Sequence, residues 1–99
     1  MVSSHALIHF PLGQTVMTRG VADLAAENEV FAKFVSQSLK RHAQGDWGDL
    51  SAEDKEDNNL SLKQELRLLS SYETQGLPKI WIITESNRLV TSILFPEDY

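Results

Sequence analysis

The chain has 99 residues, of which 41% are hydrophobic, enough for one cooperative core but too few for two ordinary domains. The sequence contains no cysteine, which excludes disulfide frameworks, thiolate zinc sites, iron–sulfur clusters and a cysteine nucleophile. Nine Lys and Arg residues against 14 Asp and Glu residues give a formal net charge of −5, so the overall field repels nucleic-acid phosphates. We therefore expect one domain, residues 1–99, that does not bind nucleic acid directly.

From the N-terminal part of the chain we expect neither a targeting signal nor a regular structural period. Residues 1–9 lack a cationic start and a sustained apolar run, and no segment approaches the roughly 20 apolar residues that span a bilayer. These features predict a cytoplasmic protein that does not enter the membrane. Residues 1–14 mix polar and apolar types, so we expect a loosely ordered arm that leads into a short strand at Thr15–Thr18.

Two helices are predicted in the first half of the chain. The segment from Gly20 to Ala26 is rich in good helix formers and would make about two turns. Asn28 suits the N-cap of a longer helix over Glu29–Ala43, in which apolar residues recur at helical spacing. Those apolar residues are Phe31, Phe34, Val35 and Leu39. Gln44-Gly45 should end this helix, because glycine tolerates the left-handed conformation that closes helices.

A third, largely exposed helix is predicted after the turn at residues 46–50. Ser51 precedes an acidic first turn in a capping-box pattern, which places carboxylates at the positive end of the helix dipole. We expect this helix to run from Ala52 to about Asn58. The pair Asn58-Asn59 should interrupt or bend it, with a further turn over residues 60–64.

The last third of the chain predicts strands. Residues 66–72 alternate in polarity, helix being an alternative over their first half, and a turn follows. Lys79–Thr84 is apolar on both faces, as in a well-covered central strand, and Leu89–Phe95 forms the last strand. The expected fold class is α+β, with a three-stranded antiparallel β-meander at the C-terminus packed against two to three N-terminal helices. One face of the hairpin 79–95 should meet these helices, and the N-terminal arm or a second subunit should cover the other.

The densest polar cluster surrounds His42. His42 and Asp46 lie across a predicted helix end, so an imidazole and a carboxylate could meet there, with Asp49 close by, and serve proton transfer or metal binding. A structural interpretation is favoured, because the helix dipole alone favours histidine near a C-terminus and aspartates are common in turns. The acidic run at residues 53–57 lacks the ligand spacing and central glycine of a calcium loop. We expect no metal and no cofactor, and an enzyme is the less favoured interpretation.

Aromatic and charged residues near the predicted sheet are candidates for contact with a partner. Trp47 is either a plug that closes its loop over the core, the favoured interpretation, or an exposed anchor at a protein interface. The other candidates lie on or beside the predicted strands, where cross-strand ion pairing also explains them without a ligand. They are Arg67, Tyr72, Glu85 and Arg88.

Three motifs occur in order along the last two-thirds of the chain. They are Arg41-His42-Ala43-Gln44-Gly45-Asp46-Trp47-Gly48-Asp49, then Arg67-Leu68-Leu69-Ser70-Ser71-Tyr72, and then Ile80-Trp81-Ile82-Ile83-Thr84-Glu85 followed by Arg88 and Thr91. In these motifs the chain resembles a family of small bacterial proteins of unknown function, often labelled plasmid-related and sometimes type I restriction accessory proteins. The sequence departs from the family pattern at Glu65, where glycine is usual, and at Ser86-Asn87, where Ala-Asp is usual. The resemblance carries no established active site and implies a setting among mobile elements.

Three functional hypotheses follow. The leading one is a non-enzymatic protein-interaction module that binds another protein, or a second copy as a homodimer, through an exposed strand edge and the Trp47 loop. A second hypothesis is a small hydrolase or metal-dependent enzyme that uses His42 with Asp46, Asp49 or Asp57, which requires these side chains to converge in a pocket. A third is an anti-restriction or anti-CRISPR inhibitor, a role that the resemblance to proteins of mobile elements implies.

Overall fold

The structure, a computed structural model, describes residues 10–99 and confirms the α+β class. Its elements in chain order are β1 (Gln14–Met17), α1 (Arg19–Glu27), α2 (Glu29–Ala43), α3 (Ala52–Lys63), β2 (Leu68–Tyr72), β3 (Ile80–Thr84), β4 (Val90–Leu94) and the short 3-10 helix η2 (Pro96–Asp98). Most of the predicted N-terminal arm, residues 1–9, lies outside the described residues. Within the described part, every helix is too short or too polar to cross a membrane.

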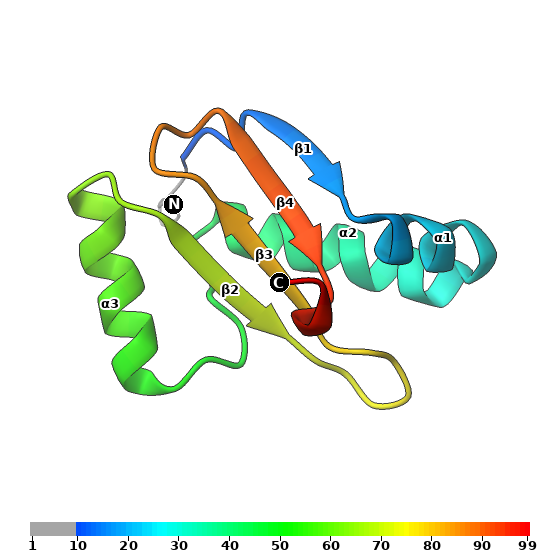
Figure 1. Cartoon of the computed structure of the whole chain (residues 1–99). Coiled ribbons are helices and arrows are strands. Elements are labelled where there is room, and N and C mark those ends of the chain that lie inside the picture. The colour runs from blue at the N-terminus through cyan, green and yellow to red at the C-terminus, as the bar shows by residue number, and fades with distance from the viewer. Residues whose placement is uncertain (1–9) are drawn as a thin grey trace, which may run out of the picture.

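The sheet has four strands in the order β1-β4-β3-β2 (Figure 1). The predicted antiparallel meander is present as β2-β3-β4, but the prediction of three strands was incomplete because β1 joins β4 in parallel. The Gln14 N–H donates to the Leu89 carbonyl at 2.8 Å, and the Thr18 N–H donates to the Ile93 carbonyl at 3.0 Å. The outer side of β4 is thereby paired, and both strands of the predicted hairpin lie inside the sheet.

Helices α1 and α2 cover one face of the sheet, while α3 lies beside the edge formed by β2 (Figure 1). The core between them joins apolar side chains of the two helices to alternate residues of the strands. These buried residues are Val21, Phe31, Val35, Tyr72, Ile80, Ile82 and Ile93. Helix α2 has the predicted bounds, and the Asn28 side chain caps it by accepting the Phe31 N–H at 3.0 Å.

Helix α3 corrects one prediction. The Ser51 side chain caps it as expected, accepting the Asp54 N–H at 3.1 Å, but the helix continues through Asn58 and Asn59 to Lys63. An asparagine weakens a helix when its side chain competes for nearby backbone groups. Here the side chain of Asn58 bonds to the backbone of Leu69 in β2, so the helix is not interrupted.

The face of the sheet away from α1 and α2 is partly covered by the C-terminal residues. Ile83 and Leu94 lie on this face, because Ile83 follows Ile82 and Leu94 follows Ile93, which both point toward the helices. Ile83 and Leu94 are both buried. Tyr99 contacts Trp81 edge to face, with ring centroids 5.8 Å apart. Among the described residues this cover comes from the chain's own end, whereas we expected the N-terminal arm or a second subunit.

Candidate functional site

His42 occupies the last turn of α2 and is fully buried against the sheet. Its Nδ1 atom is hydrogen-bonded to the Ser70 hydroxyl, and its Nε2 atom is 2.9 Å from the Thr84 hydroxyl. The Thr84 hydroxyl is 2.8 Å from the Thr91 hydroxyl, which donates to the Leu12 carbonyl at 2.7 Å. A continuous polar chain therefore crosses the core under His42.

The direction of this chain assigns the tautomer of His42. Thr91 has one hydroxyl proton and gives it to a carbonyl, so it accepts the proton of Thr84. Thr84 in turn must accept from the imidazole, which places the ring proton on Nε2. Nδ1 is then an acceptor, and Ser70 donates to it. Every polar atom of the ring is satisfied in the neutral form.

Burial holds His42 in this neutral form. Loss of solvation, with a smaller contribution from the positive charge of Arg88, lowers the pKa of His42 to about 3. Phe10 and Trp47 pack edge to face on the imidazole, at centroid distances of 5.3 and 5.6 Å. The side chain is thus closed off from solvent and is uncharged at neutral pH, as a structural residue would be.

The predicted acidic partners of His42 bond elsewhere. The Asp46 carboxylate accepts from the Arg41 guanidinium at 2.7 and 3.2 Å, and this hydrogen bond is the main cause that lowers the pKa of Asp46. The Asp49 carboxylate accepts the Glu73 N–H at 2.8 Å. Within residues 10–99 there is no group of three or more His, Cys, Asp or Glu side chains that could hold a metal ion. The convergence that the enzyme hypothesis requires is not found in this cluster.

The loop of residues 45–49 connects α2 to the edge of β2. Gly45 follows the end of α2 in the left-handed conformation, at φ +80°. Two N–H groups bond the last carbonyls of the helix: the Gly45 N–H donates to the His42 carbonyl at 3.0 Å, and the Asp46 N–H donates to the Arg41 carbonyl at 2.9 Å. The Trp47 side chain is 2% exposed, as the plug interpretation requires. An exposed aromatic anchor at this position does not fit that burial.

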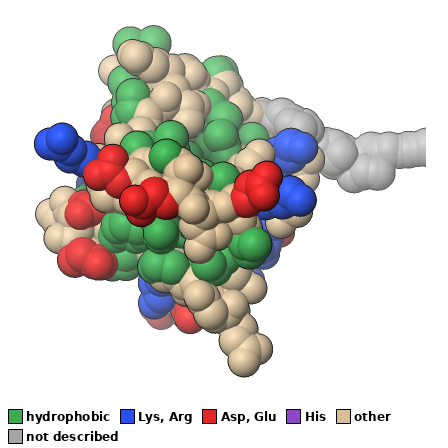
Figure 2. Space-filling model, turned by 90° about the vertical axis from the view of Figure 1, so that its right-hand side faces the viewer, with side chains coloured by type: hydrophobic (Ala, Val, Ile, Leu, Met, Phe, Trp, Pro, Cys, Tyr) green, Lys and Arg blue, Asp and Glu red, His purple; other side chains and the backbone are tan. Residues whose placement is uncertain are grey.

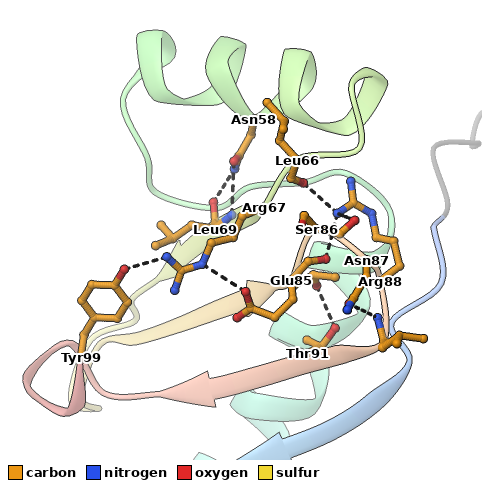
Figure 3. Close-up of polar contacts among 12 residues, drawn as sticks. Asn58, Leu66, Arg67, Leu69, Glu85, Ser86, Asn87, Arg88, Thr91 and Tyr99 are labelled. Carbon is orange, nitrogen blue, oxygen red and sulfur yellow. Dashed lines mark hydrogen bonds and ion pairs between the residues drawn. The ribbon is translucent and has the colours of Figure 1, made fainter.

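Side chains and loop backbone close the outer edge of β2. The amide of Asn58 bonds both backbone groups of Leu69, as a neighbouring strand would (Figure 3). The Ser71 N–H donates to the Trp47 carbonyl at 3.3 Å, and the Ser71 carbonyl accepts the Asp49 N–H at 2.7 Å. A Cβ atom on the intervening Gly48, at φ +75°, would overlap the Ser71 carbonyl. The outward polar groups of Leu69 and Ser71 are therefore already paired.

β1 forms the opposite edge, and no strand among residues 10–99 lies on its outer side. Gln14 and Thr18 direct their N–H groups to β4, so alternation directs the backbone groups of Thr15 and Met17 outward. All four strand residues are exposed, and none carries a charge. Val16 and Met17 are 38% and 45% exposed, on opposite faces of the strand.

A shallow groove of about 310 Å³ lies beside β1, between this strand and the helices. Its lining residues are uncharged and mostly apolar. They are Thr15, Met17, Ala25, Ala32, Val35, Ser36, Leu39 and Ile93. Figure 2 shows hydrophobic side chains reaching the surface on the side of the molecule that carries β1 and α1. The open edge and the groove together make a candidate surface for an extended segment.

The remaining predicted contact residues do not form one site. Arg67 donates to the Tyr99 hydroxyl at 2.8 Å and pairs with Glu85 at 3.7 Å, as cross-strand ion pairing predicts (Figure 3). Arg88 instead bonds backbone carbonyls of its own turn and the Leu66 carbonyl, at 2.7 Å. Tyr72 is buried and donates to the Asp46 carbonyl at 2.6 Å. Of these residues Arg67 is exposed, Glu85 and Arg88 are half-buried, and Tyr72 is buried.

Asn58, Thr84, Thr91 and the outer edge of β1 were not among the predicted site residues. Asn58 was interpreted as a helix breaker, since nothing local indicates a strand beside it. Thr91 and Thr84 had a weak signal, because each is a polar residue within an apolar strand. β1 was predicted as Thr15–Thr18, one residue later in the chain than observed, and its pairing with β4 was not predicted.

Comparison of this chain with known protein families, with curated proteins and with solved structures finds no match. The resemblance carried by the three motifs therefore stays a prediction.

Proposed function

We propose that this protein is a non-enzymatic, cytoplasmic interaction module of mobile elements that binds a protein partner by strand addition at β1. One observation carries the proposal: the β2 edge is closed by Asn58 and the 45–49 loop, while among residues 10–99 no strand covers the outer side of β1, which carries no charge. Open edges are the places where sheets accept a strand from another chain. The accessible end of this sheet is therefore the end where a partner would add.

The chemistry of the β1 edge suits an extended partner. In strand addition the backbone supplies most of the affinity, and pockets beside the edge receive alternate side chains of the added strand. Thr15 and Met17 offer the outward backbone groups, and the uncharged groove next to them would receive apolar side chains. A partner strand that turns uncharged side chains toward the groove fits both features.

Hydrogen exchange tests this proposal. The Met17→Lys variant places a charge beside the groove. Val30→Lys is the control, because Val30 is 65% exposed and lines a different hollow on α2, with Thr74 and Leu77. A partner should be captured by the wild type and by Val30→Lys but much less by Met17→Lys. When that purified partner is bound, the amides of Thr15 and Met17 should exchange more slowly. Unchanged exchange at both amides, with protection elsewhere in the chain, would overturn the proposal.

A further inference from the structure

We infer that the strand added at β1 is β1 of a second copy of this chain, paired antiparallel about a two-fold axis at Val16. The inference rests on the proposed function and names its partner. It is carried by the hydrogen-bonding groups, the side chains and the charges of this edge, which fit a second copy in one register.

The outward backbone groups of β1 are complementary to themselves. They belong to Thr15 and Met17, two residues apart. In an antiparallel pair centred on Val16, Thr15 faces Met17 of the second copy. Each of these facing pairs exchanges two N–H···O bonds, so every outward donor and acceptor of the strand finds a partner. A register shifted by two residues would leave part of the strand unpaired.

The side chains fit the same register. Val16 would face Val16 of the second copy in a non-hydrogen-bonded pair, the position where opposite side chains lie closest. That contact would cover a side chain that is 38% exposed. On the other face, Met17 would lie beside Thr15 of the second copy, at the mouth of the groove. Both apolar side chains of the edge would lose part of their exposure to water.

The distribution of charge favours contact at the β1 edge and antiparallel pairing of the two strands. Two copies that each carry a net charge of −5 repel one another, and they approach most easily where the surface is neutral. Residues 10–18 contain no charged side chain, and just beyond the strand the Asp98 carboxylate accepts a hydrogen bond from the Thr18 hydroxyl at 2.8 Å. Antiparallel pairing places the two Asp98 side chains at opposite ends of the joint strands, whereas parallel pairing would bring them together.

The closed β2 edge makes this pairing self-limiting. The same patch is used on both copies, so the contact is isologous and uses up both β1 strands. The joint sheet then ends on each side at a β2 strand whose outward groups are bonded by Asn58 and the 45–49 loop. The structure thus favours a closed dimer and not a filament.

Disulfide trapping tests the inference, because the chain contains no cysteine. In Val16→Cys the two thiols would face each other across the axis, and the matched control is Val30→Cys. Under a mild redox buffer, Val16→Cys should form linked dimers at least about tenfold faster than the control, because paired strands raise the effective thiol concentration. Thr15→Cys alone should link slowly, since it faces Met17 of the second copy. Unfolding by urea would establish that each variant folds.

The outcomes separate this inference from the proposed function. Equal linking at Val16→Cys and Val30→Cys would overturn the second copy as partner, and linking of Thr15→Cys as fast as Val16→Cys would overturn the antiparallel register. If Val16→Cys does not link while a different protein is still captured through Met17, the inference fails and the proposed function stands.

Discussion

At the scale of single residues, burial and hydrogen bonding keep the His42 imidazole neutral and out of reach of solvent. Its ring N–H donates to Thr84 and its nitrogen lone pair accepts from Ser70, while aromatic rings pack edge to face on it. A buried polar group that is fully bonded costs little, whereas a charge at the same place would lose its solvation. The His42 environment therefore selects the neutral, Nε2-protonated ring.

This selection predicts how stability depends on pH. The pKa of His42 falls from 6.5 in the unfolded chain to about 3 in the folded one, so between these values only the unfolded state takes up the proton. Stability from this group is complete above pH 6.5 and is lost as the pH falls toward 3. The loss is at most about 1.4 kcal/mol per pH unit. Urea unfolding from pH 7 to pH 5 would measure it.

The His42→Gln variant is the control for this prediction. Glutamine removes the titration but keeps a polar side chain, so the variant should be less stable at pH 7 and should show a flatter pH profile between 6.5 and 5. The same slope in the variant and the wild type would assign the dependence to other titratable groups.

At the scale of elements, two helices end by the same geometry with different residues. The residue after the C-cap is Gly45 in α2, at φ +80°, and Glu65 in α3, at φ +57°. In both, the following N–H closes the turn; for α3 the Leu66 N–H donates to the Ser61 carbonyl at 2.8 Å. A glycine, which the resemblance predicts at position 65, would adopt this conformation without a Cβ, whereas this chain has glutamate there.

The Glu65→Gly substitution should stabilise the protein. A left-handed conformation costs a residue with a Cβ about 1–2 kcal/mol, and the entropy that glycine adds to the unfolded chain returns part of that, leaving a gain of up to about 1 kcal/mol. Glu65 is exposed and its side chain makes no ion pair within residues 10–99. Thermal unfolding should therefore show a higher midpoint. The reverse change, Gly45→Glu, should lower the midpoint, and a lower midpoint for Glu65→Gly would contradict this account.

Substitution of Asn58 tests whether its side chain closes the β2 edge. Asn58→Ala removes both bonds to the Leu69 backbone and should lower the unfolding free energy by about 2–3 kcal/mol. It also frees an edge, so species larger than a dimer should appear in solution. Asp57→Ala, one position away on the exposed side of α3, should change the unfolding free energy by less than about 0.5 kcal/mol. Equal stability of the two variants would show that the edge is held closed by other groups.

At the scale of the whole molecule, the net charge and the neutral edge act in opposite directions on self-association. Each copy carries a net charge of −5, while the proposed contact contains no ion pair. The only long-range electrostatic effect between copies is therefore repulsion. The chain should associate more readily when that repulsion is screened.

Salt should therefore strengthen the proposed dimer. The Debye length falls from about 30 Å at about 0.01 M salt to about 3 Å at about 1 M, so the repulsion between copies nearly vanishes over this range. Sedimentation equilibrium at both salt concentrations should give a lower dissociation constant at high salt. Weaker association at high salt would indicate attractive ion pairs in the interface and would argue against the β1 contact.

The sequence by itself determined the local elements of this protein. Helical spacing and the Asn28 cap predicted α2 to the residue, and β-branched runs placed β3 and β4 within a residue at each end. These features depend on neighbours along the chain, where caps, periodicity and turn residues act. Charge and composition, also independent of the fold, predicted one acidic domain.

Only the tertiary structure decided which residues form a site. His42 meets Ser70 and Thr84, 28 and 42 positions away, and Asn58 meets a strand 11 positions on, contacts that no local pattern encodes. In the folded chain His42 belongs to the core. The strand edge expected at the hairpin is paired with β1, and β1 forms the edge of the sheet instead. Long-range contacts form because burying apolar faces requires them, and they alone determine which polar groups remain free for a partner.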